Sequence, residues 1–288
     1  MPERRSVYCP DSENDIIMAA VKLAITSDLH LPITKAESVS ALGREIQAFG
    51  PQSLIVAGDI GESLADVQRG LFLLREQVQC PIWVLAGNHD VWARPPYDSR
   101  QLWLEQIPAA VRASGCQWLE GGSFVLDGVA VAGTIAWYDY SAVDPTVQAS
   151  ALEFAQQKFH YNADALRIDW EWSDPEFAEH VSAPFLAQLD RLESDPSVQR
   201  VVVVTHVPIV EEQMHREPGD PRWAFSNAYF GNLTLGRKVL AYRKVSHIIS
   251  GHTHRGKVAT VQRADGSSIL AYVVPSDYEK PNCVALSV

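Results

Sequence analysis

Five stretches of the chain place polar side chains that bind metals or transfer protons directly after apolar, strand-like runs. In chain order these side chains are Asp28 and His30, Asp59, Asn88 with His89 and Asp90, His206, and His252 with His254. Carboxylate, imidazole and amide groups without cysteine suit Mn, Fe, Zn or Co better than metals that prefer thiolates. So many histidines also argue against Ca or Mg, which prefer oxygen ligands. The stretches therefore predict a transition-metal site.

The spacing suggests how these groups meet. Asp28 and His30 are two residues apart, as are His252 and His254, and in an extended chain such residues point to the same side. Sites in open α/β sheets form beyond the carboxyl ends of the strands, so we expect all five stretches to build one site. Seven ligands are too many for one tetrahedral ion but suit two ions about 3.5–4 Å apart that share a carboxylate. The seven are Asp28, His30, Asp59, Asn88, His206, His252 and His254.

Each of these residues also has a purely structural interpretation. Gly, Asn and Asp are common in turns, a single histidine is more often structural than a ligand, and Asp90 could cap the segment that follows it. Asp28 and Asp59 are harder to explain in this way, because an unpaired charge at the end of a buried strand is costly. The order of the stretches favours the metal site. We expect the other four histidines to be structural or exposed, namely His160, His180, His215 and His247.

Strand-like and helical patterns alternate along the chain and predict a layered α/β domain with two packed sheets. The expected strands cover residues 21–28, 53–59, 81–87, 128–134, 200–206, 245–251, 267–274 and 282–288. The expected helices cover residues 37–49, 64–78 and 99–113. Ser63 is a plausible N-cap for the second helix, and Pro108 interrupts the third.

The segment over residues 137–195 breaks this alternation and predicts an aromatic-rich helical insertion with two helices. Asp174 followed by Pro175 indicates an N-cap and a proline at the first helical position. The aromatic residues could form a lid or a base-stacking wall, but packing of the added helices is the favoured interpretation. They are Trp137, Tyr138, Tyr140, Trp170 and Trp172. We expect one domain over residues 21–288, preceded by an N-terminal extension over residues 1–20 that can be disordered.

Bulk composition narrows the class of protein. The 288 residues are 47% apolar and 20% charged, as in a globular protein with a sizeable core. The net charge of -11 argues against stable nucleic-acid binding, which depends on Lys and Arg. No apolar run approaches the roughly 20 residues that span a bilayer, and no signal peptide is evident, so we expect a cytoplasmic protein. The cysteines form no CxxC pair, which predicts free thiols; they are Cys9, Cys80, Cys116 and Cys283.

Taken together in this order, the five blocks resemble the calcineurin-like metallophosphoesterase family and frame residues 21–256. The resemblance implies a four-layer α-β-β-α sandwich of two mixed sheets flanked by helices. It also implies a division of the ligands between two metal ions. Asp28, His30 and His254 would hold one ion, Asn88, His206 and His252 the other, and Asp59 would bridge them. Manganese or iron is expected, with Zn, Ni or Co also possible.

The resemblance places His89 near the leaving group as a proton donor or charge stabiliser. Asp90 would orient the imidazole of His89 and favour the protonated form of that ring. Two divalent ions and two ligand carboxylates give a site charge of roughly +2, which attracts a phosphate. A water or hydroxide that bridges the metals would attack phosphorus in line, without a covalent enzyme intermediate.

The substrate is less constrained. The Ser/Thr protein phosphatase branch carries GDxxDRG and GNHE, whereas this chain has GDIGES and GNHD, so that branch is not expected. We expect a small phosphorylated substrate, such as a nucleotide, and phosphodiester hydrolysis. A phosphomonoesterase, a nucleotide pyrophosphatase and a catalytically weak metal-dependent nucleotide-binding protein are the alternatives. The candidates for substrate contacts are Arg255, Arg222 and Asn227.

Overall fold

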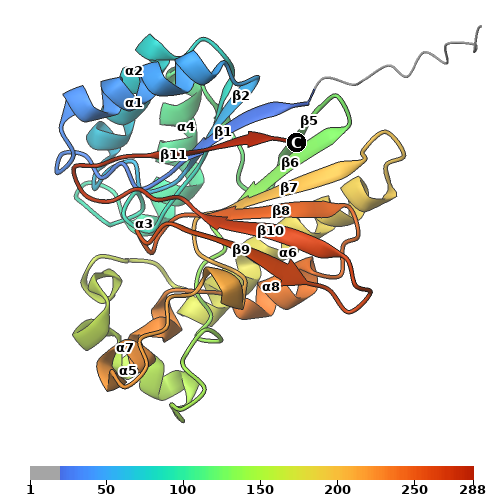
Figure 1. Cartoon of the computed structure of the whole chain (residues 1–288). Helices are drawn as coiled ribbons and strands as arrows, with labels where there is room; N and C mark the ends of the chain where they lie inside the picture. The colour runs from blue at the N-terminus through green and yellow to red at the C-terminus, as the bar shows by residue number, and fades with distance from the viewer. Residues whose placement is uncertain (1–19) are drawn as a thin grey trace, which may run out of the picture.

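The computed structural model describes residues 20–288 and shows two β-sheets between layers of helices (Figure 1). The first sheet has the strand order β11-β1-β2-β3-β4, and the second has the order β5-β6-β7-β8-β10-β9. Both sheets are mixed: β11, β5 and β9 each run antiparallel to their neighbour, and the other pairs are parallel. The expected four-layer α-β-β-α arrangement is confirmed. The extension expected over residues 1–20 lies outside the described residues except for Ala20.

The strands of the first sheet are β1 (Lys22–Thr26), β2 (Ser53–Ala57), β3 (Ile82–Leu85), β4 (Gln117–Trp118) and β11 (Cys283–Ser287). Those of the second sheet are β5 (Ser123–Leu126), β6 (Val129–Thr134), β7 (Arg200–Thr205), β8 (Val245–Ser250), β9 (Lys257–Gln262) and β10 (Ser268–Val273). All eight expected strands are present. The three that the sequence pattern missed, β4, β5 and β9, are short or largely exposed edge strands. They lack the continuous apolar run that identifies a strand buried on both faces.

The central strands are apolar throughout because both of their faces are buried. On β2, Leu54 and Val56 pack against the outer helices, while Ile55 and Ala57 pack between the two sheets. Strand β7 does the same in the second sheet, with alternate valines in the inter-sheet core and under the outer helices. Successive side chains of a strand point to opposite faces, so a continuous apolar run fits only such a doubly covered position.

Helices α1 (Ala36–Phe49), α2 (Leu64–Gln77) and α4 (Ile107–Ala113) cover the outer face of the first sheet (Figure 1). The side chain of Ser63 accepts a hydrogen bond from the backbone of Asp66, so the expected N-cap of α2 is confirmed. The stretch expected as one helix over residues 99–113 is α3 (Ser99–Gln101), the π-helical turn η1 (Leu102–Gln106) and α4. Pro108 lies in the first turn of α4, where its missing N–H costs least.

The insertion contains α5 (Ala151–Tyr161), the 3-10 turn η2 (Ala163–Leu166) and α6 (Asp174–Ser194). Both expected helices are present, but the predicted N-cap of the second is wrong by one residue. Ser173 is the N-cap of α6, and it shares two hydrogen bonds with Glu176. Asp174 instead points into the protein, because its carboxylate is the acceptor for the side chains described next.

Asp174 joins three parts of the insertion to one another: the start of α6, helix α5 and the segment that follows β6. Its carboxylate accepts hydrogen bonds from Trp137 Nε1 at 2.8 Å, Tyr140 Oη at 2.7 Å and Lys158 Nζ at 2.7 Å. Trp137 and Tyr138 are fully buried. The packing interpretation of the aromatic residues is therefore the right one.

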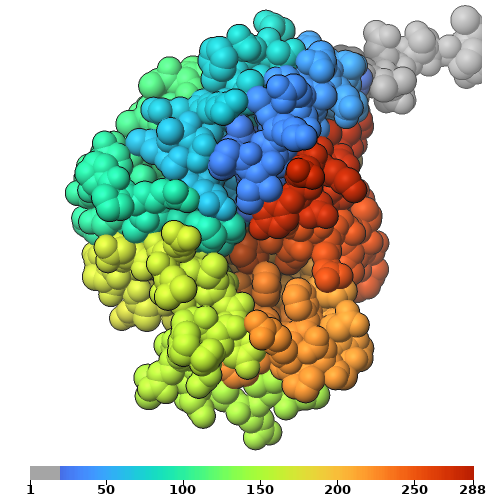
Figure 2. All heavy atoms as spheres, turned by 90° about the vertical axis from the view of Figure 1, so that its left-hand side faces the viewer, coloured from blue at the N-terminus to red at the C-terminus, as the bar shows by residue number. Residues whose placement is uncertain are grey.

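The last helical segments connect β7 to β8. They are η3 (Glu211–Gln213), α7 (Pro221–Ser226), η4 (Asn227–Tyr229) and α8 (Leu233–Val239). Figure 2 shows the insertion and the segment around α7 side by side, below the N-terminal half of the chain. Within residues 20–288, no helix combines the length and apolar character that a membrane crossing needs. Cys80, Cys116 and Cys283 are free thiols as expected, and Cys9 lies outside the described residues.

Glu120 joins the two sheets where β4 of the first approaches β6 of the second. Its carboxylate accepts hydrogen bonds from Thr134 Oγ1 at 2.6 Å and from the backbone N–H of Ile135 at 2.8 Å. Burial raises the pKa of Glu120 to about 7, and these two hydrogen bonds only partly oppose the rise. The fold therefore favours the protonated form of this side chain.

We expect stability to depend on pH through Glu120. Because its pKa is raised from 4.5 to about 7, the protonated form stabilises the fold fully below about pH 4.5, and this contribution is lost as pH rises through about 7. Glu120→Gln should therefore exceed the wild type by about 1–3 kcal/mol at about pH 8 and match it at about pH 4. Urea unfolding of metal-free protein at both pH values measures this. The exposed Glu105→Gln is the control, and an equal pH dependence in wild type and Glu120→Gln would contradict the assignment.

Candidate metal centre

The candidate ligands lie in turns after the strands, in an unusual backbone conformation. Strand β1 ends at Thr26 and β8 at Ser250, before the Asp28–His30 and His252–His254 pairs. Among the described residues, nine that are not glycine have positive φ, and five of these nine are candidate ligands. The five are Asp28 (56°), His30 (48°), Asp59 (53°), His252 (70°) and His254 (56°). The paired residues thus converge through left-handed turns, and the expectation of an extended chain is wrong. Strained residues concentrate at functional sites.

Two glycines allow these turns to approach one another. A Cβ atom on Gly58, which has φ of +85°, would overlap the backbone of Gly87. A Cβ atom on Gly87 would overlap Asp59 and lie 2.7 Å from His206 Cε1. The loops after β2 and β3 therefore pack closely around Asp59 only because both positions lack a side chain.

Hydrogen bonds connect the ligand loops to one another. The backbone N–H of Asp28 donates to Gly58 O, and that of His30 donates to Asp59 O, each at 3.0 Å. The backbone N–H of His89 donates to Asp59 Oδ1 at 2.9 Å, and that of His252 donates to Asp28 Oδ1 at 3.0 Å. Each candidate carboxylate is thus positioned by a loop other than its own.

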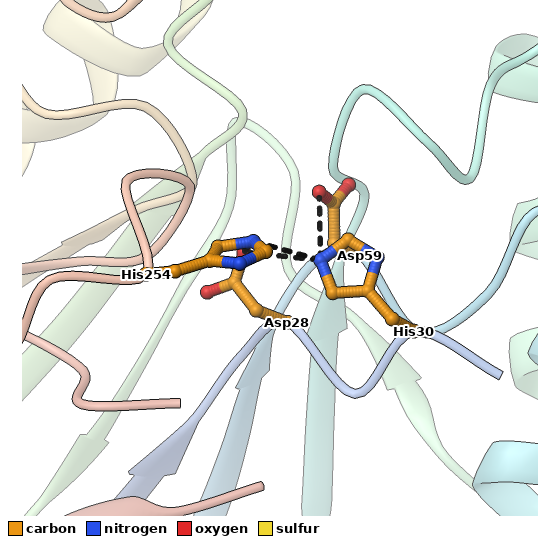
Figure 3. A group of neighbouring side chains, drawn as sticks. All are labelled: Asp28, His30, Asp59 and His254. Atoms are coloured by element: carbon orange, nitrogen blue, oxygen red, sulfur yellow. Dashed lines mark hydrogen bonds and ion pairs between the residues drawn. The ribbon is translucent and has the colours of Figure 1, made fainter. Parts of the chain in front are cut away.

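Asp28, His30, Asp59 and His254 form the first cluster, in which one ligand atom of each lies within 4.8 Å of the others (Figure 3). The Nε2 atoms of His30 and His254 face each other at 2.8 Å. His254 Nε2 lies 3.4 Å from Asp28 Oδ1, and His30 Nε2 lies 3.8 Å from Asp59 Oδ2. Two carboxylates and two imidazoles therefore aim at one point.

Asp59, His206 and His252 form the second cluster under the same criterion. Asn88 belongs to it as well, because its Oδ1 lies 3.0 Å from His206 Nε2 and 3.0 Å from His252 Nδ1. His206 Nε2 is 3.4 Å from Asp59 Oδ1. The structure thus brings together all seven candidate ligands, with Asp59 common to both clusters.

The histidines of the second cluster are prepared to bind a cation. His206 Nδ1 lies 2.8 Å from the backbone oxygen of Ala57, and His252 Nε2 lies 3.2 Å from that of Tyr229. A carbonyl oxygen can only accept, so each of these nitrogens carries the proton. When the ring is neutral, as a metal-binding histidine is, its opposite nitrogen directs a lone pair into the cluster. This outer hydrogen bond is the usual arrangement of a metal-binding histidine, and the residues present fit a pair of metal ions.

Electrostatics also favour cations at this position. Burial alone would raise the pKa of Asp59, but the nearby imidazoles of His206 and His89 hold it well below its usual value. Burial lowers the pKa of His30 and of His252 to about 4. Burial also opposes the charge on His206, yet Asp59 raises its pKa to about 9. Without metal, the Asp59 charge is thus compensated by protonated His206, a role that metal ions can take over.

Asp90 does not have the expected role. Its Oδ1 accepts the backbone N–H groups of Ile60 at 2.9 Å and Gly61 at 3.0 Å, and its Oδ2 accepts that of Gly87 at 2.9 Å. Both oxygens are therefore occupied by backbone donors of the loops after β2 and β3. Within residues 20–288, no hydrogen bond joins Asp90 to the imidazole of His89. Asp90 fixes the loops around Asp59, and the expectation that it orients His89 is corrected.

His89 lies at the edge of the first cluster, where its side chain is 16% exposed. Its ring stacks on Trp92 with the centroids 3.8 Å apart, and its Nε2 lies 3.9 Å from Asp59 Oδ2. The acid nearest to its other nitrogen is Glu62, with 3.9 Å between Nδ1 and Oε1. The sequence interpretation missed Glu62, although it follows Asp59 within the GDIGES stretch and could have been found there.

A cavity of about 340 Å³ opens beside both clusters. Its floor includes His89, Asn88, His252 and His254, and its walls include the aromatic rings of Trp92, Tyr161, Trp223, Phe230 and Tyr278. Arg255 lines it too, with its guanidinium carbon 5.4 Å from the centroid of the Trp223 ring.

Of the three expected substrate contacts, only Arg255 faces this cavity. Arg222 donates to the backbone oxygen of His160 at 3.2 Å, and Asn227 is buried and donates to that of Trp223 at 2.9 Å. Neither side chain lines the cavity. Arg222 thus joins α7 to α5, and Asn227 bonds within its own segment, so the structure gives no support to a substrate contact by either residue.

Residues 21–256 match the family model described as calcineurin-like phosphoesterase. Among solved structures, the chain is similar to a phosphopantetheinyl hydrolase from Mycobacterium tuberculosis, at 18% identity over 92% of this chain and 96% of that one, with a TM-score of 0.64. It is also similar to a dimetal phosphatase from Danio rerio, at 12% identity over 94% of this chain and 93% of that one, with a TM-score of 0.55. No curated protein matches the chain by sequence.

We expect Asp90→Ala to destabilise the protein rather than to act only on catalysis. The variant leaves three buried backbone N–H groups without acceptors, each worth about 1–3 kcal/mol. Urea unfolding of metal-free protein should show a loss of at least about 3 kcal/mol. Glu105→Ala, at an exposed position, is the control and should change stability little. Wild-type stability of Asp90→Ala together with lost activity would restore the catalytic role.

Proposed function

The chain belongs to the calcineurin-like phosphoesterase family, and from that premise we propose that it is a two-metal hydrolase of small phosphodiesters. The observation that carries the proposal is the pair of ligand clusters that share the buried carboxylate of Asp59. Two divalent ions at such a site provide positive charge for a phosphate and lower the pKa of bound water from 15.7 to about 7. Manganese or iron suits the mixed nitrogen and oxygen ligands.

The residues divide between two ions in this proposal. Asp28, His30 and His254 would hold one, and Asn88, His206 and His252 would hold the other, with Asp59 common to both. Only two of these ligands are carboxylates, so two divalent ions leave a net charge of roughly +2 at the floor of the cavity. That local charge allows a phosphate to bind although the whole chain has a net charge of -11.

His89 is the group proposed to donate a proton to the leaving oxygen. It lines the cavity, its side chain is partly exposed and stacks on Trp92, and its Nε2 lies 3.9 Å from Asp59 Oδ2 at the edge of the first cluster. Glu62 is close enough to orient the ring once a substrate tightens the 3.9 Å separation. An alkoxide leaves a phosphodiester far more readily with a proton, which favours a role of this kind.

The cavity supports a small substrate with a planar or apolar substituent. Its volume of about 340 Å³ lies at the lower end of the range for small-molecule sites. Aromatic walls bind flat groups by stacking, and Arg255 at the rim can contact a phosphate oxygen. A nucleotide ester meets these requirements. The names of the two structural neighbours, a phosphopantetheinyl hydrolase and a dimetal phosphatase, agree with phosphoester hydrolysis.

We expect the manganese-loaded protein to prefer a diester to a monoester. The kcat/KM for bis-p-nitrophenyl phosphate should exceed that for p-nitrophenyl phosphate by about tenfold or more, which equals about 1.4 kcal/mol of transition-state stabilisation. Initial rates at matched metal concentration measure it. A large preference for the monoester would reverse the assignment. If no phosphoester is hydrolysed with Mn, Fe, Ni or Co, the alternative of a metal-dependent nucleotide-binding protein is favoured instead.

We expect His89→Ala to lower kcat by about 10²- to 10⁴-fold with both metal ions retained, because a positioned proton donor contributes that much. The loss should be larger for a diester with an alkoxide leaving group than for one that releases p-nitrophenolate, which is stable without a proton. Glu62→Gln should show the same leaving-group dependence with a smaller loss. Equal losses on both substrates would mean that His89 stabilises charge instead of donating a proton.

A further inference from the structure

We infer that Asp164, on the helical insertion, is a positioning residue that sets the orientation of the Asn88 amide and so completes the second metal site. The inference rests on the proposed function, because it presupposes that Asn88 binds a metal ion. Asp164 is fully buried and lies in η2, 76 positions along the chain from Asn88.

Three donors converge on the Asp164 carboxylate. Its Oδ1 accepts from Asn88 Nδ2 at 2.9 Å and from Trp92 Nε1 at 2.6 Å, and its Oδ2 accepts from Tyr138 Oη at 2.8 Å. The backbone N–H of Asp164 donates to the side chain of Asn162 at 2.7 Å, which fixes the turn that carries it. The carboxylate is thus held from several directions.

The bond to Asn88 removes an ambiguity in that side chain. An amide can turn by half a revolution and exchange its oxygen with its NH₂ group at almost no steric cost. Only the oxygen can bind a cation, and here it lies 3.0 Å from both His206 Nε2 and His252 Nδ1. In the turned orientation, the oxygen would face the Asp164 carboxylate, and two acceptors would meet without a proton in a buried place. Asp164 therefore selects the orientation that binds metal.

The same carboxylate also supports the other side of the site. Trp92, which donates to Asp164, is the ring on which His89 stacks with centroids 3.8 Å apart. One residue of the insertion thus contacts both the metal ligand and the aromatic support of the proposed proton donor. Outer hydrogen bonds of this kind typically change metal affinity by about 10- to 100-fold when they are removed.

A purely structural role is the competing explanation, and Asp174 shows what that role is like. Asp174 belongs to the same insertion and binds Trp137, Tyr140 and Lys158 in a comparable way, but it contacts no candidate ligand. It is therefore a matched control for general loosening of the insertion.

The experiment compares two variants of Asp164 that separate position from charge. Asp164→Asn keeps the shape and an oxygen that can still accept from Asn88 and Trp92, while its NH₂ group can donate to Tyr138. Asp164→Glu keeps the charge but displaces it by one methylene group. Mn²⁺ binding to metal-free protein is measured by calorimetry and by metal analysis after dialysis, and thermal melting without metal reports on folding.

We expect wild type to bind two Mn²⁺ ions per chain. Asp164→Glu should weaken one of them by about tenfold or more, whereas Asp164→Asn and Asp174→Glu should leave both within a few-fold of wild type. In an Asn88→Ala background, Asp164→Glu should have no further effect on Mn²⁺ affinity, because the contact through which Asp164 acts is already absent.

Three results would overturn the inference. One is equal Mn²⁺ affinity in wild type and Asp164→Glu. Another is a loss in Asp164→Asn but not in Asp164→Glu, which would make charge the cause. The third is an equal loss in Asp174→Glu, which would make it a general effect of the insertion. Failure of the wild type itself to bind Mn²⁺ would instead reject the metal site on which the proposed function depends.

Discussion

The buried carboxylate of Asp59 is the constraint on which the rest of the centre depends. It belongs to both ligand clusters, accepts the backbone N–H of His89, and lies where Gly58 and Gly87 let two loops approach closely. A charge in such a place is unfavourable unless cations or hydrogen bonds compensate it. The surrounding imidazoles do so in the metal-free protein, and two metal ions would do so more fully. The loops that follow the strands of both sheets thus bring positively charged groups around the two carboxylate oxygens of Asp59.

The turns that carry the ligands are costly to form. Five candidate ligands have positive φ, and at about 1 kcal/mol each this strain amounts to several kcal/mol, a substantial part of a typical folding free energy of about 5–15 kcal/mol. The strain is offset by contacts between loops, chiefly the three backbone bonds to Asp90 and the backbone bonds to Asp28 and Asp59. Asp90 therefore belongs to the support of the site rather than to its chemistry.

The helical insertion is part of the centre and not only an addition to the sheet. Asp174 holds its parts together through three side-chain donors, and Asp164 reaches from it to Asn88 and Trp92. Tyr161 of the same segment contributes to the wall of the cavity. The insertion thus connects the orientation of the candidate ligand Asn88 with the shape of the cavity beside both clusters.

The sequence alone determined the doubly buried strands and the seven candidate ligands, because continuous apolar runs and polar strand ends are local patterns. All seven, from Asp28 to His254, could be predicted from the spacing and order of the five polar stretches. Only the tertiary structure decided the partner of each supporting side chain. Asp90 accepts backbone N–H groups, Glu62 lies beside His89, and Asp164 accepts a hydrogen bond from Asn88. Arg222 and Asn227 donate to backbone oxygens and do not line the cavity. Those contacts join loops that are distant in the chain, and a side chain's partner across such a distance leaves no periodic signal in the sequence.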